Sequence, residues 1–473
     1  MNQPVIPVPP TGIEDLAPPA VRGAGLDRPA PVRAVASWIL YDLANTVFSM
    51  GVISLYFSEW LRGQVGPERA DVVLGSITSV SMGIIFIISP LLGAMSDRAR
   101  RRMPFLFVST VLCVGMTALM GSAGYRGTII AFVLANAAYQ AGLQFYDSLL
   151  VEVTTETNRG RIGGLGIGLG YVGSYIAVGI GLVLGADDLS LVFTLIAIAF
   201  LALATPCFVF VVERGNPNAG NVFDPRFVWQ STKRTLGALR DGRSHPGLVR
   251  FLVGRMFYTD AINTVISFMT LFALNVFALA GVPDDVASKR KNLVLMAAIS
   301  FAIVGGVIWG RVVDRIGPKR TLTIVLGLWV ATFSLACAMG VFAFPSLVLW
   351  IVAAMAGIAI GGTWSADRPL MLRLTPPDRV GEFYGLYGMV GRFSAILGPV
   401  LWGEATAISL RRFGVTPDNV EKIDVHLRHV LILRSQGVAV AVLLVMILVS
   451  WWILRPVDDS PRDWAKLQAR AAH

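Results

Sequence analysis

The stretch DLANTVFS, Asp42 to Ser49, returns far downstream as DAINTVIS, Asp260 to Ser267. The two copies share Asp, Asn, Thr, Val and Ser in the same order and spacing. Each copy lies within a long apolar segment, where a charged side chain costs about 2.5–3.5 kcal/mol at the centre of a bilayer. Because the copies are separated by nearly half of the 473-residue chain, the pattern predicts two related halves.

Other pairs keep almost the same separation. The sequence GAMSDR at 93–98 matches GRVVDR at 310–315, Arg161 matches Arg379, and the GxxG pattern at 170–173 matches the one at 388–391. A separation that persists across several apolar segments indicates a duplication. An even number of spans separates equivalent positions, so the two halves have the same orientation, as in transporters with parallel repeats.

The composition indicates a polytopic membrane protein. The chain is 55% hydrophobic and 15% charged, against roughly 25% charge in soluble domains, and its mean hydropathy is +0.65. A helix crosses a bilayer with about 20 mostly apolar residues. We therefore predict an all-α membrane protein with about twelve transmembrane helices in two pseudo-symmetric six-helix bundles. The predicted spans are 36–61, 72–95, 104–124, 128–152, 163–185, 189–212, 249–279, 292–313, 321–342, 346–371, 382–408 and 430–454.

Basic residues in the short loops predict the orientation. The loops after the second and eighth spans are rich in Arg, and they share one side with the N-terminal tail and the long central connection. This side is therefore predicted to be cytoplasmic, with both termini on it, although loops 280–291 and 409–429 fit the rule poorly. The net charge of +10 is scattered over such loops. It indicates membrane topology and predicts no nucleic-acid partner.

The predicted organisation has five parts. They are a disordered cytosolic tail at 1–34, an N-terminal bundle at 35–212, a cytoplasmic linker at 213–248, a C-terminal bundle at 249–455 and a cytosolic tail at 456–473. Part of the linker has helical spacing of apolar residues. This spacing suits either a helix on the membrane surface or an ordinary basic linker.

The sequences GAMSDRARRR (93–102) and GRVVDRIGPKR (310–320) resemble the cytoplasmic loop motif of the major facilitator superfamily. The first copy has Arg100 where a glycine is usual, while the second copy keeps Gly317. A short loop of this kind places an acid near helix ends and arginines of the other half. We expect Asp97, Arg98, Asp314 and Arg315 to form a cytoplasmic gate that breaks when the halves rock.

Three further stretches resemble the vacuole-effluxer branch of that superfamily, whose best-known members release amino acids from fungal vacuoles. They are SWILYDLANTVFS, FYDSLLVEVTTETNRGRIGGLGIGLGYVG and GGTWSADRPLMLRLTPPDRVGEFYGLYGMVGRFSAILGP. The resemblance implies an amino-acid transporter. The compact loops and the preference for Arg over Lys favour a bacterial inner membrane over a fungal one.

The polar residues of the repeated stretch lie at i, i+3, i+4 and i+7, on one face of a helix. We expect the two stripes, which include Asp42, Asn45, Asp260 and Asn263, to face a central cavity and to bind substrate or protons. The alternative is that they only hydrogen-bond neighbouring helices.

Additional polar candidates occur in the fourth, tenth and eleventh spans. Gln140, Gln144 and Asp147 share a helical face, and Asp367 precedes Arg368. The two acids either face the cavity or pair with cytoplasmic arginines. Arg392, predicted at mid-depth, either binds a substrate carboxylate or pairs with an acid of a first helix.

We therefore predict a secondary active transporter that moves a small polar solute, an amino acid above all, by alternating access, with proton coupling left open. The alternatives are a cation symporter for a sugar or other solute, and a non-transporting sensor or assembly factor. The sequence has no catalytic triad or Walker motif and no complete metal-ligand set, so we predict no enzyme activity, no cofactor and no metal. The expected partners are the lipid bilayer and a small-molecule substrate, and the expected state is a monomer.

Overall fold

The computed structural model describes residues 25–184, 188–217, 219–238, 247–415, 423–460 and 464. Most of the predicted N-terminal tail and of the C-terminal tail lies outside these residues. The first half contains nine α-helices and one π-helix. They are α1 (Val32–Phe48), the π-helix η1 (Ser49–Tyr56), α2 (Phe57–Val65), α3 (Pro67–Arg98), α4 (Met103–Leu119), α5 (Gly124–Ser148), α6 (Leu150–Val153), α7 (Arg159–Gly170), α8 (Val172–Leu184) and α9 (Leu189–Phe210).

A linker helix, α10 (Pro225–Ala238), separates the halves. It packs against both α3 and α15, but the side chains that suggested an interfacial face are largely outside the described ones. The second half contains six long helices and a short 3-10 turn. They are α11 (Leu248–Leu279), α12 (Asp284–Ile316), α13 (Pro318–Phe342), α14 (Leu347–Arg373), η2 (Pro377–Arg379), α15 (Val380–Arg412) and α16 (Val425–Leu454).

The helices account for the predicted spans. Eleven helical segments of the described chain are long and apolar enough to cross a membrane, and α4 is a shorter apolar helix of 17 residues. Two spans are composite: the first runs through α1, η1 and α2, and the fifth through α7 and α8. The π-helix begins at Ser49, the last residue of the polar stripe of the first span, and π-helical turns are frequently found at functional sites.

The two copies of the loop motif turn differently. Gly317 ends α12 with φ +88°, in the left-handed region that a glycine adopts without strain, and Pro318 begins α13. In the first copy, α3 ends at Arg98, and the next residue, Ala99, is extended, with φ −68° and ψ 152°. The first loop therefore makes its turn without the glycine that the motif usually supplies.

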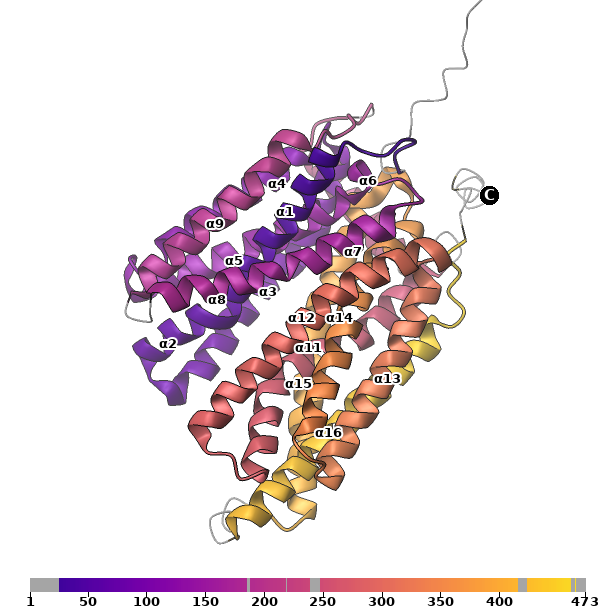
Figure 1. Ribbon diagram of the computed structural model, residues 1–473. Coiled ribbons are helices and arrows are strands. Elements are labelled where there is room, and N and C mark those ends of the chain that lie inside the picture. The colour runs from indigo at the N-terminus through magenta and orange to yellow at the C-terminus, as the bar shows by residue number, and fades with distance from the viewer. Residues whose placement is uncertain are drawn as a thin grey trace, which may run out of the picture.

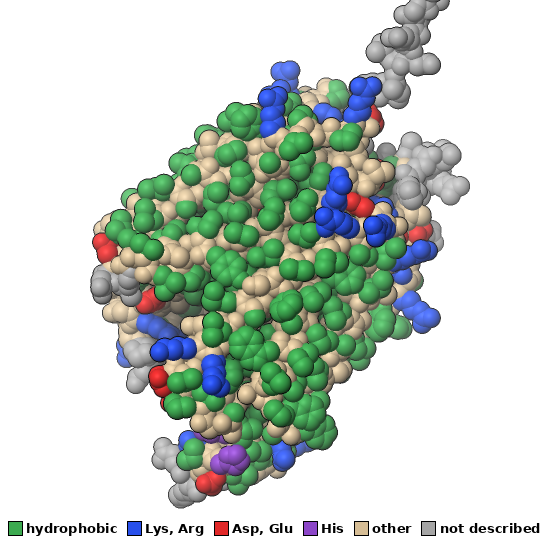
Figure 2. Space-filling view, in the orientation of Figure 1, with side chains coloured by type: hydrophobic (Ala, Val, Ile, Leu, Met, Phe, Trp, Pro, Cys, Tyr) green, Lys and Arg blue, Asp and Glu red, His purple; other side chains and the backbone are tan. Residues whose placement is uncertain are grey.

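The two bundles lie side by side, the N-terminal one in indigo to magenta and the C-terminal one in salmon to yellow (Figure 1). Two long contacts join them: α3 packs on α15, and α7 packs on α12. We call these the α3–α15 seam and the α7–α12 seam. Apolar side chains are spread over the middle of the face shown in Figure 2, and charged side chains lie toward its ends, as expected of a surface that contacts lipid.

Both described terminal segments dock at the end of the molecule that carries the Arg-rich loops, which we call the basic end. The N–H of Leu26 donates to the carbonyl of Thr154 at 2.8 Å. Near the other terminus, Asp459 accepts from the N–H of Lys319 at 3.0 Å and pairs with Arg373 at 3.2 Å. The termini therefore share one side, as an even number of spans requires.

Candidate functional site

A cavity of about 570 Å³ lies between the two bundles. Helices of both halves contribute to its wall, and the residues that line it are mostly polar or aromatic. They include Asp42, Asn45, Thr46, Ser49, Tyr139, Gln140, Gln144, Asp147 and Tyr171 of the first half, and Arg255, Thr259, Asn263, Trp364, Arg368, Tyr384, Tyr387 and Arg392 of the second.

Two acids of the first half share one arginine of the second. Arg368, on α14, lies with Nη1 3.4 Å from Asp42 Oδ2 and Nε 3.0 Å from Asp147 Oδ1. The guanidinium also lies 5.6 Å from the centre of the Tyr146 ring, within the range of a cation–π contact. Two formal negative charges therefore face one positive charge, and all three groups line the cavity.

A second ion pair lies within the C-terminal half. Arg255 Nε is 3.0 Å from Asp367 Oδ2, and the same carboxylate accepts from the hydroxyls of Tyr258 at 2.5 Å and Tyr387 at 2.7 Å. Asp367 is fully buried and lies behind the cavity wall, while Arg255 and Tyr387 line it. Such an acid is fully satisfied and holds Arg255 in place. This arrangement differs from both expectations for Asp367, since it neither faces the cavity nor pairs with the loop arginines.

Arg392 lies on α15 and lines the cavity with no carboxylate partner among the described residues. Its Nη1 donates to Ser89 Oγ at 3.1 Å and its Nη2 donates to the Gln140 carbonyl at 3.0 Å, both in the first half. Its Nε is buried without a hydrogen-bond partner. Gln144 supports this contact because its side-chain oxygen accepts from Ser89 Oγ at 2.6 Å.

The two copies of the repeated stripe differ. Asp42, Asn45 and Asn263 line the cavity as expected, but Asp260 does not. Its Oδ2 accepts from the N–H of Gly398 on α15 at 2.8 Å, and only 1% of the residue is exposed. The sequence pattern could not distinguish these outcomes, because an acid on one helical face reaches either a cavity or a neighbouring backbone.

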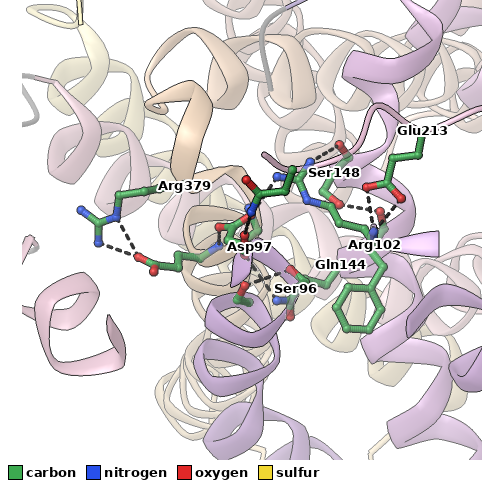
Figure 3. A network of polar contacts seen from close by, with 12 residues as sticks. Ser96, Asp97, Arg102, Gln144, Ser148, Glu213 and Arg379 are labelled. Carbon is green, nitrogen blue, oxygen red and sulfur yellow. Dashed lines mark hydrogen bonds and ion pairs between the residues drawn. The ribbon is translucent and has the colours of Figure 1, made fainter. Parts of the chain in front are cut away.

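Asp97 connects the halves at the basic end of the α3–α15 seam (Figure 3). Its carboxylate accepts from the N–H groups of Gly381 at 2.8 Å and Glu382 at 2.7 Å, in the first turn of α15. It also pairs with Arg102 of its own half at 2.8 Å. A carboxylate at a helix N-terminus satisfies unpaired N–H groups and interacts favourably with the helix dipole.

Asp314 makes the equivalent contact at the α7–α12 seam. Its oxygens accept from the N–H of Gly160 at 2.6 Å and of Arg161 at 2.9 Å, in the first turn of α7. Each half thus places its motif acid on the fifth span of the other half. We call the two acids with these backbone contacts the latch.

The arginines of the gate motif have other surroundings. The carbonyl of Arg98 accepts from the linker residue Gly220 at 3.1 Å, and Arg315 is exposed. The expected gate residues therefore lie at the basic end, but the seam contacts that Asp97 and Asp314 make are with backbone N–H groups and not with the gate arginines' side chains.

Glycines allow the seams to close. A Cβ on Gly164 would lie against the carbonyl of Gly306 and within 2.6 Å of the Cα of Gly310. At the other seam, a Cβ on Gly93 would lie 2.9 Å from the Cα of Glu382. Both seams are therefore packed backbone to backbone at the basic end, and the cavity is closed on that side.

Sequence reasoning missed two arginines of the cavity. Arg368 was considered only as the neighbour of Asp367, and Arg255 was not among the candidate residues. A signal was available for both: Arg255 lies in the predicted span 249–279 and Arg368 in the predicted span 346–371, where an arginine needs an acid. Three acids and three arginines, counting Asp367, then balance formally.

The comparisons with known proteins agree with this architecture. The model of the Major Facilitator Superfamily matches residues 43–399 and 261–472. The chain is 25% identical over 381 residues to the uncharacterized MFS-type transporter YxiO of Bacillus subtilis, a match that covers 77% of this chain and 86% of that protein. It is also 25% identical over 297 residues to Autophagy-related protein 22 of Yarrowia lipolytica, covering 56% of this chain and 49% of that protein.

Among solved structures, the proton:xylose symporter XylE bound to 6-bromo-6-deoxy-D-glucose aligns with a TM-score of 0.60 at 15% identity, covering 93% of this chain and 97% of that one. This likeness concerns the fold. The chain belongs to the Major Facilitator Superfamily and resembles its vacuole-effluxer branch. It is a multi-pass integral membrane transporter of small solutes and not an enzyme.

Proposed function

We propose that the protein is a secondary active transporter of zwitterionic amino acids, with substrate bound in the cavity between the halves. The observation that carries the proposal is the distribution of charge along the cavity wall. Asp42 and Asp147 share Arg368, which leaves a formal excess of one negative charge. Arg392 has no described carboxylate partner, which leaves a formal excess of one positive charge.

A free amino acid matches this distribution. Its ammonium group would lie near Asp42 and Asp147, and its carboxylate would receive the guanidinium of Arg392, which forks well onto a carboxylate. The unpartnered Nε of Arg392 supplies one donor for that contact. Similarity to Autophagy-related protein 22 supports a transporter of this general kind, and the cavity is the reason for naming the substrate class.

Proton coupling would act through the same acids. A proton on Asp42 or Asp147 would remove the local negative excess and leave one acid paired with Arg368. We therefore propose that a proton and the substrate ammonium group compete for these two acids. The basic end would face the cytoplasm of a bacterial cell, with substrate entering from the opposite side in the conformation described here.

The test is uptake of labelled amino acids by proteoliposomes, with and without a pH gradient, and with a labelled sugar as a second substrate. Arg392→Gln should lower uptake at limiting substrate by about thirtyfold, because a charge-assisted contact contributes about 2 kcal/mol. Asp42→Asn should lower it as well. Arg411→Gln removes the same charge from an exposed position of the same helix, α15, and should leave uptake unchanged.

Competition by an analogue examines the carboxylate contact separately. An amino-acid amide lacks the carboxylate, so it should compete poorly with the labelled amino acid for uptake by the wild-type protein. For uptake by Arg392→Gln, the amide should compete nearly as well as the unlabelled amino acid does. Sugar uptake without amino-acid uptake would favour the alternative symporter. Amino-acid uptake that is insensitive to both variants would remove this cavity as the binding site.

A further inference from the structure

A second cavity, of about 910 Å³, opens at the basic end of the α7–α12 seam. Its wall contains Arg161 from α7 and Arg311 and Arg315 from α12, all exposed. Among the described residues, none of the three forms an ion pair. Three acids also line this cavity: Asp27, Glu156 and Asp314. Glu156 pairs with Arg159 at 2.7 Å, and the oxygens of Asp314 are engaged by the backbone of α7, so these two acids do not neutralise the three arginines directly.

The arginines continue apolar stripes that face away from the protein. On α12, the large apolar residues Phe301, Val304 and Ile308 are 41–52% exposed, and they lead to Arg311 and Arg315 at helical spacing. On α7, Leu169 is 40% exposed, two turns from Arg161 on the same face. Both walls of the seam thus change from apolar to cationic at the same end.

The lengths of these helices place the change at the level of the lipid headgroups. Helix α12 has 33 residues, while about 20 residues cross the hydrocarbon core. The polar first turns of α12 end at Asn292, and about 20 residues from there reach Arg311, so Arg311 and Arg315 lie at the boundary of the core on the basic end. In the orientation of Figures 1 and 2, basic side chains gather near the place where α7 begins and α12 ends, beside an apolar surface.

We propose that this cavity binds the headgroup of an anionic phospholipid, with an acyl chain along the apolar stripe of α12. The phosphate would contact Arg161 of one half and Arg311 and Arg315 of the other. Basic pockets between membrane helices on the cytoplasmic side attract such headgroups. Because the three arginines come together only where the seam is closed, the lipid would stabilise the conformation that is closed at the basic end.

Ligand-induced stabilisation tests the proposal, since a ligand that binds the folded state raises its unfolding temperature. Delipidated protein in detergent would be titrated with short-chain phosphatidylglycerol, short-chain phosphatidylcholine or inorganic phosphate, with unfolding followed by tryptophan fluorescence. Phosphatidylglycerol should bind at least about tenfold more tightly than phosphatidylcholine, given three arginines at the surface. Phosphate alone should give no comparable shift.

The variant R161Q/R311Q/R315Q should lose the preference for phosphatidylglycerol. A matched control, R100Q/R101Q/R320Q, removes three exposed arginines from the same end of the molecule and should keep it. Replacement of the three cavity arginines by lysine keeps the charge and should keep most of the preference, so it reports on the site if the glutamine variant folds poorly.

Equal shifts from both lipids, or equal loss of the preference in the glutamine variant and its control, would overturn the proposal. A full shift from phosphate alone would overturn the assignment to a lipid. None of these outcomes depends on which solute the protein transports, so this proposal and the proposed function fail independently.

Discussion

The variant Asp314→Asn tests whether the latch determines which side of the transporter is open. Asp314 accepts two hydrogen bonds across the α7–α12 seam, from Gly160 at 2.6 Å and Arg161 at 2.9 Å. Both donors are in the first turn of α7, where the helix dipole also favours an anion. Asparagine keeps one carbonyl acceptor, but it loses the charge and the second acceptor.

The expected magnitude follows from these contacts. Hydrogen bonds to a charged group contribute about 1.5–3 kcal/mol each. Asp314 is half-buried, so water can replace part of what is lost, and we expect a loss of about 2 kcal/mol from the conformation closed at the basic end. That corresponds to about a thirtyfold change in the ratio of closed to open molecules.

The assay is double electron–electron resonance between spin labels on cysteines that replace Arg100 and Arg320. Both positions are exposed at the basic end, one in each half. The native thiols Cys113, Cys207 and Cys337 would first be changed to serine. The fraction of molecules with the longer distance between the two labels should be larger in Asp314→Asn than in the labelled protein that lacks only the native cysteines.

Asp188→Asn is the matched control. Asp188 accepts from the N–H of Leu191 at 3.0 Å and caps α9 within the first half. It has the same chemistry as Asp314 but no contact across a seam, so its loss should leave the distance distribution unchanged. An unchanged distribution in Asp314→Asn, or an equal change in Asp188→Asn, would refute the role of the latch.

Three further variants separate structural groups from transport groups. Asp260→Asn should keep uptake within about threefold, because an amide oxygen can still accept from the α15 backbone; a loss of more than tenfold would return Asp260 to the substrate site. Gly164→Ala places a methyl group against the carbonyl of Gly306, and the same pair of spin labels should report a larger open fraction. Arg255→Met leaves the buried Asp367 without its cation and should lower the free energy of unfolding by about 3–5 kcal/mol. In the double variant with Asp367→Asn, part of this lost stability should return, and the unfolding temperature should rise above that of Arg255→Met.

The sequence was sufficient for the architecture, because bilayer thickness and duplication constrain it strongly. Apolar runs of about 20 residues predicted the spans, and the observed helices extend most of them by a few residues into the loops. The break of the first span into α1, η1 and α2 was not predictable from hydropathy. A π-helical segment changes the register of side chains without changing the composition.

The site was only partly predictable, because spacing determines the face of a helix but not its neighbour. Asp42 and Asp260 occupy equivalent positions, yet one meets Arg368 in the cavity and the other meets a backbone N–H of α15. The N–H that Asp260 meets belongs to Gly398, which precedes Pro399 in α15. Equivalent positions in a duplicated chain therefore share a helix face more reliably than they share a partner.

The cavity contacts and the latch both join the two halves of the molecule. Arg368 and Arg392 both extend from the second half to groups of the first half, and the latch acids cross the seams at the basic end. A movement that opens the basic end must break both sets of contacts. Water can satisfy the latch groups as they separate, since the loops are exposed. The cavity groups are largely buried, so a substrate carboxylate is needed to compensate an arginine, and a substrate ammonium or a proton is needed to compensate an acid. If the proposed function is right, water can replace the latch contacts but not the buried contacts of the cavity. Binding in the cavity, rather than release of the latch, would then couple substrate binding to reorientation.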